Sequence, residues 1–174
     1  MTKRLLLIDG HSMAYRAFFA LPAENFTTAQ GQHTNAIYGF ATMLISLIKE
    51  EKPTHIAVAF DVSRKTFRTE IFPEYKANRS KTPDEFRSQM SYLHELVSAF
   101  GIQQFEIEGY EADDIIATIT KRAEKEKCEV LICTGDRDSF QLVNDQTTIL
   151  YPKRGVSEMS RMTPEAVITK YGMS

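Results

Sequence analysis

Seven carboxylates lie where a parallel sheet would bring them together. They are Asp9, Asp61, Glu111, Asp113, Asp114, Asp136 and Asp138. Asp9, Asp61 and the last pair follow short apolar runs, whereas the other three open a segment with helical periodicity. Because the carboxyl ends of parallel strands line the ligand-binding crevice of an open α/β sheet, we expect all seven at one edge.

Carboxylates gathered in this way repel one another and raise each other's pKa values, and a divalent cation relieves that repulsion. No cysteine or histidine accompanies the cluster except His11, and we assign no role to His33 or His55. Oxygen ligands favour Mg²⁺ or Mn²⁺ over Zn²⁺. This many acids can hold two ions about 4 Å apart, which suits hydrolysis of a phosphodiester.

Each acid also has an ordinary structural explanation. Asp9 before Gly10 could form a turn, and the acids at 111–114 could favour the positive end of a helix dipole. The acids at 136 and 138 could lie in a solvated loop. These explanations do not account for three separate strands that all end in aspartate. The sequence has no G-x-x-x-x-G-K-[ST] or G-x-G-x-x-G run, which argues against an NTPase or a dinucleotide enzyme.

The elements that must position these acids alternate between strand and helix. Strand-like runs cover 4–9, 55–61, 129–136 and, more weakly, 148–151, with a candidate edge strand at 104–108. Helical periodicity covers 37–48, 86–100 and 112–123, and a last helix begins at Thr163. We expect the second helix to start with a capping box from Thr82 to Glu85 and to end at Gly101. The alternation predicts an α/β fold, with a mainly parallel twisted sheet and helices on both faces.

Length and composition set outer limits. The chain has 174 residues and 43% apolar residues, enough for one domain with a core. With 21 basic and 23 acidic residues, the net charge of -2 excludes a globally basic nucleic-acid binder but not a local basic patch. No apolar run reaches the roughly 18 residues of a membrane span, and residues 1–7 read as a strand, not as a signal peptide. Cys128 and Cys133 are predicted to be reduced, as in cytosolic proteins.

Residues 61–82 break the alternation of strands and helices. Connections longer than about 12–15 residues are uncommon unless they are functional or disordered. This one interleaves Phe67, Phe72 and Tyr75 with an excess of basic residues. The basic side chains are Arg64, Lys65, Arg68, Lys76, Arg79 and Lys81. The mixture suits a single-stranded nucleic acid, although a solvated loop pinned by its aromatic residues fits equally well.

Seven sequence blocks carry a resemblance to a known family. They are LIDGH (7–11), YRAF (15–18), AFD (59–61), FR (67–68), YKANR (75–79), GYEADD (109–114) and TGDRD (134–138). In this order they resemble the 5′ nuclease or flap endonuclease family, which includes the 5′–3′ exonuclease domain at the N-terminus of bacterial DNA polymerase I. The resemblance covers essentially the whole chain, and its GYEADD and TGDRD blocks are the most specific.

The resemblance implies a PIN-like fold with a basic helical arch at 62–82 and two divalent ions, Mg²⁺ or Mn²⁺. It implies that the seven acids are the ligands, some through water. Arg16 matches a basic residue near the scissile phosphate, and Lys76 and Arg79 match positions that stabilise the phosphate in the transition state. The remaining arch residues expected to contact DNA are Arg64, Lys65, Arg68, Tyr75 and Lys81.

The activity implied is that of a 5′–3′ exonuclease and flap endonuclease. It would act on DNA flaps, single-strand/duplex junctions and RNA primers during replication and repair. The resemblance also implies a cytoplasmic, nucleoid-associated bacterial protein with no membrane contact and with a polymerase domain in the same full-length chain. The family's helix-hairpin-helix-like element does not follow residues 162–172, so we expect 1–174 to be the N-terminal catalytic part. Two alternatives remain: a fragment that binds branched DNA without cutting it, and a PIN-like single-strand ribonuclease.

Overall fold

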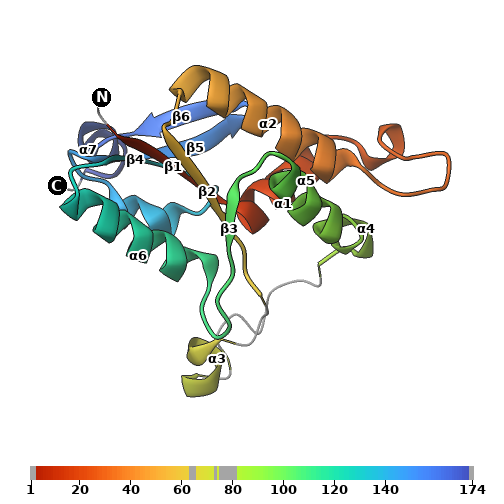
Figure 1. The fold of residues 1–174 in the computed structure, drawn as a ribbon, viewed down its shortest axis with the longest axis horizontal. Coiled ribbons are helices and arrows are strands. Elements are labelled where there is room, and N and C mark those ends of the chain that lie inside the picture. Colours follow the sequence, from red (N-terminus) through yellow and green to blue (C-terminus); the bar gives the residue numbers. More distant parts are fainter. Residues whose placement is uncertain (1–2, 63–65, 73, 75–81, 173–174) are drawn as a thin grey trace.

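The computed structural model describes residues 3–62, 66–72, 74 and 82–172 (Figure 1). The strands are β1 (Arg4–Asp9), β2 (His55–Ala59), β3 (Gln103–Phe105), β4 (Glu129–Cys133), β5 (Thr147–Arg154) and β6 (Glu158–Met162). The α-helices are α1 (Gly10–Ala20), α2 (Asn35–Glu51), α3 (Phe67–Ile71), α4 (Asp84–Arg87), α5 (Met90–Ala99), α6 (Ala112–Lys125) and α7 (Pro164–Tyr171). Two 3₁₀ helices, η1 (Ala23–Asn25) and η2 (Arg137–Leu142), complete the elements. No helix of the described ranges is long and apolar enough to cross a membrane.

The six strands form one sheet in the order β3-β2-β1-β4-β5-β6. All neighbours are parallel except β5 and β6, which are antiparallel. β1 lies at the centre, with Asp9 level with Ala59 of β2 and Ile8 level with Cys133 of β4. The chain leaves β1 towards β2 and returns on the other side as β4, so the carboxyl ends of β1 and β4 flank the switch point at which ligands bind. The predicted α/β fold and mainly parallel sheet are confirmed.

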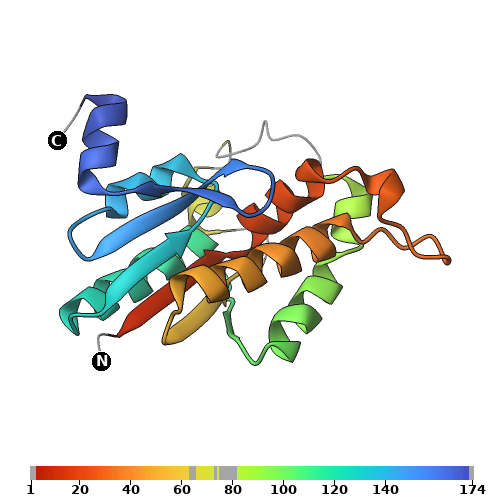
Figure 2. The same ribbon diagram turned by 90° about the horizontal axis from the view of Figure 1, so that it is seen from above.

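Both faces of the sheet are covered, which explains the nearly continuous apolar runs of its central strands. Leu6 and Ile8 of β1 pack into one core with α1, α2 and α5. Leu7, between them in sequence, packs into the opposite core with α6 and η2. Figure 1 shows α2 and α5 apart from α6, and Figure 2 shows α7 beyond the β6 side of the sheet.

The prediction of a single helix over 86–100 is wrong in one respect, because the structure divides this segment into α4 and α5. Gln89 lies at the break and is fully buried. Its side-chain oxygen accepts hydrogen bonds from the backbone N–H groups of Ala36 and Ile37, and its amide nitrogen donates to Asn35. The Gln89 side chain thus provides hydrogen-bond acceptors for the backbone N–H groups at the amino end of α2, which have no partner within that helix. The start of the helix also differs, since Pro83, not Thr82, is the N-cap residue.

Other elements differ at their ends. β2 and β4 stop at Ala59 and Cys133, two and three residues before the predicted ends, so Asp61 and Asp136 lie in the loops that follow. The edge strand β3 occurs where expected, although it has only three residues. Helix α1 and strand β6 were not predicted. Both cysteines are free, as expected.

Candidate functional site

Asp9 joins the central strand to the first helix. It is the last residue of β1 and the N-cap of α1, with 6% of its surface exposed. Its Oδ1 accepts a hydrogen bond from the Ser12 amide at 3.1 Å, and its Oδ2 accepts one from the Thr134 hydroxyl at 3.1 Å. The turn that sequence suggested is therefore a helix N-terminus, which favours a negative charge.

The environment of Asp9 is strongly acidic. Burial, followed by the charge of Asp113 and then that of Asp61, raises the pKa of Asp9 from 3.8 to about 7. The hydrogen bonds from Ser12 and Thr134 act in the opposite direction. Three of the predicted acids, from β1, the loop after β2 and α6, are thus close enough for their charges to interact. A carboxylate held in this way gains most from a nearby cation.

Asp61 connects the end of β2 to the start of α6. Its Oδ1 accepts a hydrogen bond from the Ala112 amide at 2.6 Å. Glu111 is the N-cap of α6 and forms a capping box with Asp114. Asp113 lies in the same first turn and is half-buried. The first turn of α6 therefore brings three acids to the edge of the sheet at which Asp9 lies.

Arg68 is drawn into this acidic turn. Its guanidinium donates two hydrogen bonds to Asp114, from Nη1 to Oδ2 and from Nη2 to Oδ1, each 2.7 Å long. Nη1 also lies 3.6 Å from Glu111 Oε2. We predicted Arg68 as a DNA contact and Asp114 as a metal ligand; the structure pairs them with each other.

The loop after β4 adds the remaining acids. Asp136 caps η2, where its Oδ1 accepts a hydrogen bond from the Asp138 amide at 2.9 Å. The Asp136 amide donates to the Thr134 hydroxyl at 3.1 Å, and that hydroxyl donates to Asp9. The Gly135 amide donates to the Ser12 hydroxyl at 3.0 Å. Thr134 and Ser12 thus tie the β4 loop to the end of β1, and Asp138 is exposed.

Sequence reasoning did not single out Thr134 or Ser12. Thr134 is fully buried and links two candidate ligands, Asp9 and Asp136. A signal was present, because Thr134 opens the TGDRD block. Ser12 could not be recognised in this way. Its amide donates to the N-cap residue Asp9, and this contact can be expected only if a helix is predicted after Asp9.

The donor chemistry of this edge fits a hard cation. The side chains are carboxylates with one buried hydroxyl beside them, and Mg²⁺ and Mn²⁺ prefer such oxygen ligands. Within 3–62, 66–72, 74 and 82–172, however, no three His, Cys, Asp or Glu side chains are arranged to hold a metal ion. Several of the carboxylates accept hydrogen bonds from protein groups, so binding would require these to exchange some of their partners; they are Asp9, Asp61, Asp114 and Asp136.

The predicted basic residues are only partly described. Arg16 is exposed on α1, the helix that Asp9 caps, and its Nη2 lies 3.5 Å from the Lys153 carbonyl oxygen. Six of the predicted DNA contacts lie outside the described ranges. They are Arg64, Lys65, Tyr75, Lys76, Arg79 and Lys81.

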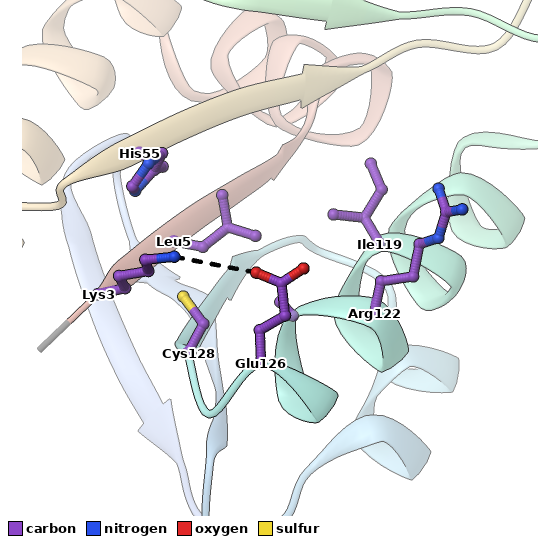
Figure 3. Close-up of a pocket in the computed structure, with 8 residues that line it drawn as sticks. Lys3, Leu5, His55, Ile119, Arg122, Glu126 and Cys128 are labelled. Atoms are coloured by element: carbon purple, nitrogen blue, oxygen red, sulfur yellow. Dashed lines mark ion pairs between the residues drawn. The ribbon is translucent and has the colours of Figure 1, made fainter.

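A pocket lies at the opposite edge of the sheet from the seven acids (Figure 3). Its volume is about 200 Å³, and it is lined by the carboxyl-terminal part of α6 and by residues at the amino ends of β1, β2 and β4, including Leu5, His55 and Cys128. Lys3 forms an ion pair with Glu126 at 3.9 Å across it. None of the seven acids lines this pocket, so it is separate from the carboxylate edge.

Comparison with known proteins places the chain in a family. Residues 4–172 match the family described as "5'-3' exonuclease, N-terminal resolvase-like domain". The DNA polymerase I of Mycobacterium tuberculosis is 59% identical over 170 residues, which are 98% of this chain and 19% of the relative. The DNA polymerase I of Bacillus subtilis is 49% identical over 172 residues, or 99% of this chain and 19% of the relative. The chain thus spans about a fifth of the length of these curated relatives.

Solved structures show the same fold. The bacteriophage T5 D15 protein co-crystallised with metal ions has a TM-score of 0.72 at 22% identity, over 98% of this chain and 61% of that one. The T5 D15 flap endonuclease in a complex with DNA and metal ions has a TM-score of 0.71 at 21% identity, with the same coverage of 98% and 61%. The predicted fold and family are therefore confirmed. The chain belongs to the 5′–3′ exonuclease family and represents its N-terminal resolvase-like domain.

Proposed function

We propose that this chain is the catalytic part of a divalent-metal-dependent 5′ nuclease that hydrolyses phosphodiesters in DNA. The observation that carries the proposal is the position of Asp9, which is buried at the carboxyl end of the central strand and close enough to Asp113 and Asp61 for their charges to raise its pKa. Carboxylates held close together in this way are typical of functional sites, and a divalent cation relieves their repulsion. Membership in the 5′–3′ exonuclease family supports the same chemistry.

The ligands that we propose are the carboxylates nearest to this centre. Asp9, Asp61 and Asp113 would hold one ion, and Glu111, Asp136 and Asp138 would complete the site directly or through water. A pair of Mg²⁺ or Mn²⁺ ions would supply an activated water and stabilise the leaving oxygen. The Thr134 hydroxyl fixes the position of Asp9 relative to Asp136, because it bonds to the carboxylate of the first and to the backbone amide of the second. Arg16, Lys76 and Arg79 would contact the phosphate.

The substrate that we propose is DNA with a 5′ flap or a single-strand/duplex junction. The T5 relative in complex with DNA is a flap endonuclease, which supports this class. RNA primers, a polymerase domain in the same full-length chain and a nucleoid-associated cytoplasmic location follow from the polymerase I relatives and are part of the proposal. The basic segment 62–82 would receive the 5′ single strand, with Arg64, Lys65, Tyr75 and Lys81 as contacts.

A second candidate function is binding of branched DNA without cleavage. It is favoured by the absence, within the described part of the chain, of three side chains already arranged around a metal ion.

The experiment that separates these functions is cleavage of a 5′-labelled flap DNA in Mn²⁺, with EDTA as a control. The matched substrates are a linear duplex and a single-stranded RNA of the same sequence. We expect metal-dependent cleavage near the flap junction and little product from the other two substrates. Retarded migration of the flap without product would support the binding function, and preference for the RNA would instead indicate a single-strand ribonuclease.

A further inference from the structure

The Arg68–Asp114 pair joins two segments that lie far apart in the sequence. Two parallel N–H···O bonds of 2.7 Å give the geometry in which a guanidinium and a carboxylate interact most strongly. The side chains are partly shielded, with 32% of Arg68 and 22% of Asp114 exposed. The pair is therefore better protected from solvent screening than an ordinary surface ion pair.

Asp114 has little capacity left for another partner. Its Oδ2 accepts a hydrogen bond from the Glu111 amide at 3.0 Å in addition to the one from Arg68 Nη1. Its Oδ1 accepts from Arg68 Nη2. A carboxylate offers about four acceptor positions, so at least three of those of Asp114 are used within the protein. The charge of Asp113, in the same turn, acts on Asp9.

Helix α3 depends on such contacts for its position. It has five residues, too few to be stable alone. Figure 1 shows it apart from the layers of the sheet, below the connection from β3 to α6. The Phe67 amide donates to the Gly109 carbonyl at 2.9 Å, and the Phe67 ring lies 5.6 Å from the Tyr110 ring. Of the contacts named here, the one between Arg68 and Asp114 is the one that reaches a residue of α6.

We propose that Arg68 and Asp114 form a latch that holds α3 against the first turn of α6, and that Asp114 is a positioning residue, not a cation ligand. The latch fixes the helical turn that carries Glu111 and Asp113, and it offsets one of the negative charges there. Arg68 then acts within the protein and not as a contact to DNA. The inference deepens the proposed function, on which it rests for the identity of the cation site.

The first test compares two double variants of equal charge, Arg68→Gln/Asp114→Asn and Arg68→Gln/Asp113→Asn. Each loses Arg68 and one aspartate, so only the identity of the aspartate differs. Mn²⁺ binding is titrated for both and for the unmodified chain, without nucleic acid. We expect the variant lacking Asp113 to bind Mn²⁺ at least about tenfold more weakly than the variant lacking Asp114, because the first loses a direct ligand whereas the second loses a residue that only positions the ligands. Equal weakening would overturn the proposal.

The second test measures the latch through hydrogen exchange of the Phe67 amide, which donates to Gly109. Arg68→Gln and Asp114→Asn should each speed exchange by roughly tenfold, as expected for loss of a charged hydrogen-bonded pair. The double variant should add little to either single change, because both remove the same interaction. Arg68→Lys keeps the charge without the paired geometry and should restore part of the protection.

Unchanged protection in all four variants, with native near-ultraviolet circular dichroism, would overturn the latch. Neither test uses nucleic acid. If the unmodified chain failed to cut flap DNA, the proposed function would fail while both measurements would still report on the Arg68–Asp114 pair.

Discussion

Replacing Asp9 with asparagine should stabilise the protein in the absence of divalent cations, and the gain should grow with pH. The pKa of Asp9 is raised from 3.8 to about 7, chiefly by burial and then by the charges of Asp113 and Asp61. A carboxyl whose pKa is raised on folding stabilises the folded state while protonated. That stability is fully present below the unfolded pKa of about 4 and is lost as pH rises through the folded pKa of about 7.

The magnitude follows from the shift. Each pKa unit corresponds to about 1.4 kcal/mol. Near pH 5.5 Asp9 must take up a proton on folding, which lowers the free energy of unfolding by about 2 kcal/mol relative to a side chain that does not titrate, and near pH 8.5 it stays ionised in the folded state, which lowers it by about 4 kcal/mol. Asparagine avoids this cost but loses the hydrogen bond that Asp9 accepts from Thr134, worth about 1 kcal/mol. Asp9→Asn should therefore raise the free energy of unfolding by about 1 kcal/mol near pH 5.5 and by about 3 kcal/mol near pH 8.5.

Urea denaturation in EDTA at these two pH values measures the effect. Asp145→Asn is the matched control, because Asp145 is an exposed aspartate in the turn before β5. This control should leave the free energy of unfolding nearly unchanged at both pH values. Addition of Mn²⁺ should then stabilise the unmodified chain more than the Asp9→Asn variant, since the variant lacks a ligand. An advantage of Asp9→Asn that stayed constant with pH, or that was absent, would refute the account of a buried carboxylate strained by its acidic neighbours.

Three further substitutions test the packing around the site. Thr134→Val should raise the pKa of Asp9 above about 7, because the hydroxyl donates to that carboxylate; a carbon-13 titration of the side chain would show it. Gln89→Leu should lower the free energy of unfolding by about 2–4 kcal/mol in urea, since it leaves the buried amides at the start of α2 unpaired. Gly10→Ala should lower the free energy of unfolding by about 1–3 kcal/mol, because the added Cβ would overlap the buried Phe60 ring. A thermal melt measures this effect, and an unchanged melting temperature would contradict it.

Much of the fold could be predicted from the pattern of apolar residues. The central strands are buried on both faces, so their runs are continuous and their order along the chain is clear. Asp9 and the acids at 111–114 were placed correctly at one edge, because parallel strands end together. Strand β6 was missed because Glu158 and Arg161 interrupt it, as suits an edge strand with a solvated side. Helix α1 was missed because it buries small residues such as Ala14 and Ala17, which give a weak pattern.

The contacts that depend on distant residues could not be predicted. Arg68 and Asp114 are 46 positions apart, and nothing local to either one indicates that they pair. The break at Gln89 likewise comes from another element, since its side chain bonds to the start of α2. Thr134 could be recognised as important only within its sequence block, because its role is to join Asp9 to the loop after β4. In each case tertiary contacts, not local propensity, decide the arrangement.

The central claim is that the carboxylates around Asp9 bind a divalent cation. Anomalous diffraction from crystals soaked in Mn²⁺ tests it most directly, because the signal locates the ion itself. The account predicts a peak at the carboxyl edge of the sheet, within ligand distance of Asp9 and Asp113, that disappears in Asp113→Asn. A peak only elsewhere, or a peak at this edge that persists in Asp113→Asn, would contradict the account.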